Sequence, residues 1–96
     1  MEYHGAVLNL SDATLTHEGQ KLELTKNQFR ILQILLENTA KIVSRESIIT
    51  RLWESDEFID DNTLTVNIAR LRKKLEQIGL ARMIRTKKGI GYMAEK

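Results

Sequence analysis

The chain has 96 residues with 42% hydrophobic and 29% charged side chains, a formal net charge of +2 and no cysteine. That length and composition fit one globular domain with one core and exclude a second domain, while the missing cysteines exclude disulfides, thiolate metal sites and a cysteine nucleophile. No apolar run approaches the roughly 20 residues that cross a bilayer, and the start has no basic region followed by an apolar one, so we expect a soluble, cytoplasmic chain without a membrane partner.

The segment from residue 6 to residue 24 alternates in the manner of strands. Apolar side chains recur around residues 7–10, 15 and 22–24, and turn-forming residues lie between them at 9–12 and 17–20. We therefore expect three short strands that consecutive hairpins join into a small antiparallel sheet. Residues 1–5 show no pattern, and we interpret them as the remnant of a linker.

Two helices are predicted in the middle of the chain. Thr25-Lys26-Asn27-Gln28 is a capping box, and the helix that it begins runs to about Asn38 with apolar residues on several faces, as in the centre of a core. Ile42-Val43 is a candidate strand, and Ser44 caps a second helix. Its predicted buried side holds Ile48, Ile49, Leu52 and Trp53. The acidic, aperiodic segment 54–61 that follows is longer than the turn of a simple helix-turn-helix.

The stretch from Asn62 to Gly79 predicts a third helix. Five apolar residues recur there in steps of four and three, which places them in one stripe that faces a core. They are Leu64, Ile68, Leu71, Leu75 and Ile78. Asp60 or Asp61 is placed to cap the start of the helix, and Gly79 can adopt the left-handed conformation that ends it.

The outward face of this helix carries side chains that suit DNA. Arginine and asparagine make bidentate contacts to guanine and adenine edges, and the methyl groups of Val66 fit a thymine methyl. Basic residues opposite an apolar stripe are also common on a helix face that is merely solvated. The distribution of charge favours DNA. Residues 1–61 carry six Lys/Arg against eleven Asp/Glu, a net of −5, whereas residues 62–96 carry nine against two, a net of +7.

The end of the chain is predicted to form a β-hairpin. Residues 83–87 and 92–94 alternate on either side of a turn that contains Gly89 and Gly91. Its tip carries Lys87 and Lys88, and lysines at such a position often serve only solubility. Because they follow a basic helix face, they also form a second element that can reach phosphates or a neighbouring minor groove.

Several separated motifs occur in a fixed order. They are Leu24-Thr25, Val43-Ser44-Arg45-Glu46, Leu52-Trp53, the run from Asn67 to Leu75, and Thr86 to Tyr92. Together they resemble the C-terminal winged-helix effector domain of OmpR/PhoB-type bacterial response regulators, and residues 61–67 are similar to the BceR- or GraR-like branch that responds to antimicrobial peptides. The resemblance implies an α+β winged helix-turn-helix over residues 6–96, with an N-terminal antiparallel sheet, three helices and a C-terminal hairpin wing. The family's receiver domain is not among these residues.

The resemblance also implies roles for individual residues in sequence-specific binding of double-stranded DNA and in transcription regulation. The implied base contacts are Val66, Arg70, Thr86 and Lys88. The implied phosphate contacts are Trp53, Asn62, Thr63, Asn67, Arg72, Lys73, Lys74, Lys87 and Tyr92. The implied RNA polymerase loop is Glu54, Asp56, Glu57 and Phe58. Asn62 and Ala69 stand where some members have arginine and Asn67 where others have histidine, so we expect a different sequence preference.

The partners that the resemblance implies follow from the family's mode of action. Two copies would bind a direct-repeat DNA site head to tail, and RNA polymerase is a further partner. In a full-length protein, a receiver domain and a sensor histidine kinase would complete the system. Since the chain has no long heptad seam, we expect the isolated domain to be a monomer that pairs only on DNA.

We expect no enzyme, no cofactor and no metal site. The only histidines are His4 and His17 in the opening segment, and the chain has no glycine-rich phosphate loop. The acidic residues 54–61 lack the spacing of an EF-hand loop. One alternative stays open: a winged helix that binds proteins through the same face without binding DNA. Salt distinguishes the two, because binding through phosphates weakens steeply as salt rises.

Overall fold

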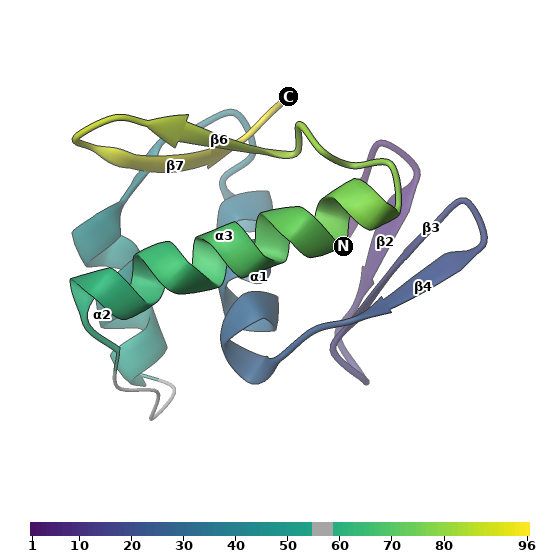
Figure 1. The fold of residues 1–96 in the computed structure, drawn as a ribbon, viewed down its shortest axis with the longest axis horizontal. Coiled ribbons are helices and arrows are strands. Elements are labelled where there is room, and N and C mark those ends of the chain that lie inside the picture. Colours follow the sequence, from purple (N-terminus) through teal and green to yellow (C-terminus); the bar gives the residue numbers. More distant parts are fainter. Residues whose placement is uncertain (55–58) are drawn as a thin grey trace.

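The computed structural model describes residues 1–54 and 59–96, and Figure 1 shows its arrangement of helices and sheets. In chain order the elements are β1 (Glu2–Tyr3), β2 (Ala6–Asn9), β3 (Thr14–His17), β4 (Gln20–Glu23), α1 (Lys26–Glu37), β5 (Val43–Ser44), α2 (Arg45–Glu54), α3 (Asp61–Gln77), β6 (Ile84–Lys87) and β7 (Gly91–Ala94). The expected order of sheet, three helices and hairpin is confirmed. Over the described residues, no helix has the length and apolar character needed to span a bilayer.

The N-terminal sheet has four antiparallel strands in the order β1-β2-β3-β4, one more than the alternation predicts. Glu2 pairs with Val7 and Tyr3 with Ala6, and the Tyr3 side chain is buried. Residues 1–5, interpreted from the sequence as the remnant of a linker, thus form the first strand of the sheet and a turn. The strand has only two residues, too few for alternation to be visible, and a tight turn at His4 and Gly5, both at positive φ, returns the chain.

The core lies between the three helices and the inner faces of both sheets. From α3 it receives the predicted stripe, since Leu64, Ile68, Leu71 and Leu75 are all buried, and Ile78 just beyond the helix is buried as well. Burying such a side chain contributes about 1.5–3 kcal/mol relative to leaving it in water. The stripe therefore decides which side of α3 faces outward.

Both ends of α3 are closed by the residues that the sequence indicates. Of the two candidates, Asp60 and Asp61, it is Asp60 that caps the N-terminus, because its carboxylate accepts the Thr63 N–H at 2.7 Å. At the other end Gly79 has φ +80°, and the Leu80 N–H donates to the Leu75 carbonyl at 2.9 Å, as in a Schellman motif. The helix thus presents a fixed length of outward face.

The second helix buries fewer residues than predicted. Ile48 and Leu52 are buried and Ile49 is partly buried, whereas Trp53 is 50% exposed. The expectation that Trp53 lies on the buried side is wrong, because Ile48 and Leu52 define the stripe and Trp53 lies 100° to one side of it. Its indole N–H donates to the Ile59 carbonyl at 3.1 Å.

The second sheet has the strand order β5-β7-β6 and joins the C-terminal hairpin to the body of the domain. Val43 pairs with Tyr92 and Ser44 with Gly91. The predicted strand at Ile42-Val43 is displaced by one residue, and Ile42 is 45% exposed. At Gly91 an added Cβ would lie 2.0 Å from the Val43 carbonyl oxygen, so only glycine permits this pairing. The hairpin is therefore anchored at the end of β7 that lies next to its turn.

Replacing one stripe residue of α3 should cost far more stability than replacing an outward one. We expect Leu71→Ala to lower the free energy of unfolding by about 2–5 kcal/mol, because it leaves a cavity among buried side chains. The exposed Glu76→Ala on the same helix should change it by at most about 0.5 kcal/mol. Urea unfolding followed by circular dichroism measures both. Equal costs would show that the stripe does not carry the packing of α3.

Candidate nucleic-acid interface

One face of the molecule is formed by the outward side of α3 and by the adjacent hairpin β6–β7. In Figure 1 the hairpin lies alongside α3, whereas the N-terminal sheet lies near the C-terminal end of the same helix. Val66, Arg70 and Lys73 are exposed on α3, and Lys88 is exposed at the hairpin tip. Among the residues that the structure describes, neither Arg70 nor these lysines has a hydrogen-bond or ion-pair partner within the chain. These charges are available to a ligand.

Arg45, the first residue of α2, connects this helix to both elements of the face. Its Nε donates to the Asp61 carboxylate at 2.8 Å, and its Nη2 donates to the Asp61 carbonyl at 2.6 Å and to the Thr65 hydroxyl at 2.7 Å. Its Nη1 donates to the Tyr92 hydroxyl at 2.6 Å. The hydrogen bond that Arg45 donates to the Asp61 carboxylate raises the pKa of Arg45 above its ordinary value, so the guanidinium is charged at all working pH values.

Tyr92 lies in the middle of this polar network. The residue is 4% exposed, and the guanidinium carbons of Arg45 and Arg72 lie 5.6 Å and 5.8 Å from the centroid of its ring, within reach of cation–π attraction. Arg72 also donates to the Ile84 carbonyl at 3.3 Å and to the Thr86 hydroxyl. Three side chains with predicted DNA contacts, Arg72, Thr86 and Tyr92, thus hold the hairpin against α3.

Other predicted contact residues occupy different flanks of α3. Asn62 is exposed and Thr63 half-buried in the first turn, and the Asn67 amide donates to the Thr63 carbonyl at 2.9 Å. Lys74 is separated from Arg70 and Lys73, because its ammonium donates to the Glu23 carbonyl at 3.0 Å and to the Gln28 side chain at 2.7 Å. Its position favours a role in docking the N-terminal sheet onto α3.

The predicted polymerase loop is described only at its start. Glu54 is exposed at the end of α2. Asp56, Glu57 and Phe58 lie outside the described residues, so their predicted role has no structural counterpart here.

Arg45 is the residue of the face to which sequence reasoning assigned no role. A signal was present, because a cation in the first turn of a helix is disfavoured by the helix dipole and needs a compensating partner. Arg45 directly follows the cap Ser44, whose hydroxyl accepts the Ser47 N–H at 3.1 Å. The partners themselves, Asp61 and Tyr92, lie 16 and 47 positions away, and no local pattern indicates them.

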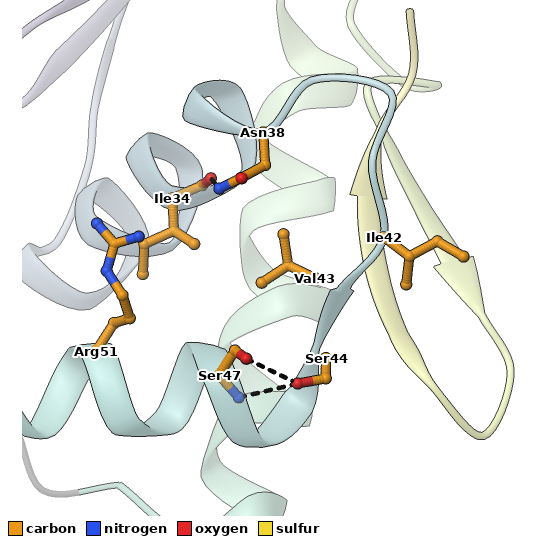
Figure 2. A pocket seen from close by; sticks show the side chains of 7 residues that line it. All are labelled: Ile34, Asn38, Ile42, Val43, Ser44, Ser47 and Arg51. Atoms are coloured by element: carbon orange, nitrogen blue, oxygen red, sulfur yellow. Dashed lines mark hydrogen bonds between the residues drawn. The ribbon is translucent and has the colours of Figure 1, made fainter.

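A hollow of about 410 Å³ lies away from this face, between the end of α1, β5 and the start of α2 (Figure 2). Its polar side chains already bond to the protein. Asn38 donates to the Ile34 carbonyl at 2.8 Å, Ser44 donates to Ser47 at 2.9 Å, and Arg51 pairs with Glu37 at 2.9 Å. Over the described residues, no three His, Cys, Asp or Glu side chains gather where a metal ion would fit. The basic face is therefore the candidate site.

Comparison with known proteins gives a family and several relatives. Residues 19–94 match the family described as the C-terminal part of transcriptional regulatory proteins. The sensory transduction protein BceR of Halalkalibacterium halodurans is 48% identical over 92 residues, which cover 96% of this chain and 40% of that protein. The response regulator protein GraR of Staphylococcus aureus strain MRSA252 is 46% identical over 96 residues, which cover 100% and 43%. The chain thus spans about two fifths of these curated relatives.

Solved structures show the same fold. The C-terminal domain of the nisin resistance regulator NsrR, a lantibiotic response regulator, superposes with a TM-score of 0.90 at 39% identity over 99% of this chain and 96% of that one. The DNA-binding domain of the response regulator AdeR in complex with an intercistronic region superposes with a TM-score of 0.84 over 99% and 97%. At 20% identity the AdeR likeness supports the fold alone.

The cap of α3 predicts a dependence of stability on pH. The Thr63 N–H lowers the pKa of Asp60 below 3.8, so the cap stabilises the fold above the unfolded-state pKa and loses this effect as pH falls through the folded-state pKa. We expect Asp60→Ala to lower Tm at neutral pH, and this difference from the parent should shrink below pH 3.8. Thermal unfolding across this range measures it. A difference in Tm that does not vary with pH would contradict the role of the carboxylate.

Proposed function

This chain belongs to the family of C-terminal domains of OmpR/PhoB-type transcriptional regulatory proteins, and from that premise we propose that it binds specific double-stranded DNA and regulates transcription as the effector domain of a two-component response regulator. One observation carries the proposal. Unpaired cations of α3 and of the hairpin tip gather on a single face, above a helix whose opposite side is buried. An α-helix of this kind fits the major groove, and a hairpin beside it reaches the adjacent backbone or minor groove.

The proposed base contacts come from both elements of the face. Arg70 is suited to the acceptor edge of guanine, and the methyl groups of Val66, 38% exposed, are suited to a thymine methyl. Thr86 and Lys88 would read the groove that the hairpin enters. The Thr86 hydroxyl already accepts a hydrogen bond from Arg72, so it would use its remaining donor toward a base.

The proposed phosphate contacts divide into two groups. The first group is Asn62, Thr63, Asn67 and Lys73 on α3 and Lys87 at the end of β6, which are exposed or half-buried and would position the face on the backbone. Trp53, Arg72, Lys74 and Tyr92 already have partners within the protein. For these four we propose at most a secondary contact. The main role of Arg72 and Tyr92 would be to hold the hairpin against α3, whereas Lys74 and Trp53 would hold other parts of the domain together.

The proposed partners extend beyond the DNA duplex. As in the family, two copies would bind a direct repeat head to tail, while the isolated domain would be a monomer. A receiver domain and a sensor histidine kinase would control it in a full-length protein of the cytoplasm. Phosphates would repel the carboxylates of the acidic segment that begins at Glu54, so this segment would point away from the DNA. As in the family, it would contact RNA polymerase.

Replacing Arg70 should change sequence preference as well as affinity. We expect Arg70→Ala to weaken binding to the selected operator by about 1–3 kcal/mol and to relax preference mainly at one base pair. Arg82→Ala is the matched control, because Arg82 is an exposed cation in the connection between α3 and β6, where it lines a hollow together with Tyr3 and His4. Selection from a random duplex pool, followed by titration of single-base variants, measures both effects. An equal loss on every sequence would make Arg70 a phosphate contact.

Replacing Lys88 should change the salt dependence of binding. Each neutralised phosphate contributes about −0.9 to the slope of log affinity against log salt, so Lys88→Ala should make this slope less negative by about one. Fluorescence anisotropy with a labelled duplex over a series of salt concentrations measures it. An unchanged slope would place the hairpin tip off the DNA. If the parent showed no salt-dependent DNA binding at all, the remaining interpretation would be a protein-binding winged helix.

A further inference from the structure

The two DNA-facing elements need a fixed relative orientation to read one site together. A hairpin of two four-residue strands is only marginally stable by itself, and two-residue β5 is the one strand that the structure pairs with it over the described residues. The hairpin is anchored next to its turn, where Gly91 meets Val43 and pairs with Lys87. Over the described residues, no backbone hydrogen bond joins the hairpin to α3, so the orientation of the hairpin relative to α3 depends on side-chain contacts.

Arg45 contacts both α3 and the hairpin. Its side chain bonds to Asp61 and Thr65 in the first turns of α3 and to Tyr92 in β7. Its backbone N–H also donates to the carbonyl of Ile90, in the hairpin turn, at 3.2 Å. One residue at the start of α2 is therefore joined to the start of the outward helix and to the hairpin.

Arg72 is the second arginine near the Tyr92 ring, and it connects α3 to the other strand of the hairpin. It extends from the second half of α3 to Ile84 and Thr86 in β6. Tyr92 thus lies near two guanidinium groups. That of Arg45 bonds to the first turns of α3, and that of Arg72 comes from the second half of α3. Because Arg72 contacts only the hairpin and α3, Arg45 alone among the described residues ties both of these elements to α2 through its side chain.

The chemistry of Arg45 favours positioning over direct contact with DNA. A guanidinium has five N–H groups, and four of those of Arg45 already donate within the protein. Its charge is balanced by Asp61, and the side chain is only 25% exposed. A lysine would keep the charge but would lose the planar fork that reaches several acceptors at once.

We infer that Arg45 is a positioning residue, which sets the orientation of the β6–β7 hairpin relative to α3 and thereby the arrangement of base pairs that Arg70 and Lys88 read together. This inference rests on the proposed function only for its consequence in DNA recognition. The mechanical part, a hairpin held to α3 through Arg45, is a property of the free protein.

The first measurement uses the free protein and Arg45→Lys, with Arg51→Lys as the matched control. Arg51 also lies on α2 in an ion pair, but with Glu37 of α1 and away from the hairpin. In Arg45→Lys, residual dipolar couplings should report a reoriented hairpin, and amide exchange in β6 and β7 should accelerate about tenfold while α1 amides keep the parent rates. Unchanged couplings and exchange rates, or an equal acceleration in every element, would overturn the inference.

The second measurement uses DNA. Arg45→Lys should reduce the ratio of operator to random-sequence affinity by about tenfold, with the salt slope unchanged because the charge is kept. Two results together would make Arg45 a phosphate contact and overturn the inference. They are a loss of affinity that is equal on both duplexes and, in Arg45→Met, a slope of log affinity against log salt that is less negative by about one. If the parent itself shows no sequence preference, the proposed function fails, and the couplings of the free protein still decide the positioning role.

A milder variant keeps the test decisive if Arg45→Lys does not fold. Thr65→Val removes one acceptor of the Arg45 guanidinium and leaves the bonds to Asp61 and Tyr92. A smaller change of the same kind, confined to the hairpin and to the specificity ratio, is expected. Hairpin couplings identical to those of the parent would contradict the role of this network.

Discussion

The rotation of α3 about its own axis is the constraint on which the candidate site depends. Four residues at alternating steps, Leu64, Ile68, Leu71 and Leu75, are buried, and their burial leaves one orientation for the helix. At 100° per residue, a turn of the helix by one position would bring Arg70 to the edge of the core. The cost of burying an unpaired charge forbids that arrangement. The outward direction of Arg70 and Lys73 is thus a consequence of packing on the opposite side.

Polar contacts then place the second element of the face. The hairpin has few buried side chains of its own, mainly Ile84 and Tyr92, and its attachment next to the turn relies on the close approach that Gly91 permits. Two arginines, Arg45 and Arg72, add directional bonds that apolar packing cannot supply. Because these two guanidinium groups already bond to the protein, the cations of the face that are available to a ligand are Arg70 and Lys73 on α3 and Lys88 at the hairpin tip.

The division of charge along the chain acquires a spatial meaning in this arrangement. The basic third of the sequence forms α3 and the hairpin, whereas the acidic first part forms the sheet and helices behind them. Asp61 begins α3, and Arg45 pairs with its carboxylate at 2.8 Å. At this end of the face, a phosphate backbone would therefore meet a carboxylate that a guanidinium already balances. This agrees with the family to which the chain belongs.

The sequence by itself determined the features that depend on near neighbours. The stripe and both ends of α3, the capping box at Thr25 and the hairpin turn at Gly89 follow from helical periodicity, caps and turn chemistry, all of which act within a few residues. Strand β1 was not predicted, because a strand of two residues is too short to show an alternating pattern.

Only the tertiary structure decided which flank each polar side chain serves. Lys74 turns to the N-terminal sheet and Arg72 to the hairpin, although both belong to one basic run, because each lies on a different side of the buried stripe. The roles of Arg45 and of the exposed Trp53 depend on partners that the fold brings near, Tyr92 in one case and Ile59 in the other. Such contacts join segments whose distance in the chain leaves no local pattern, so only packing reveals them.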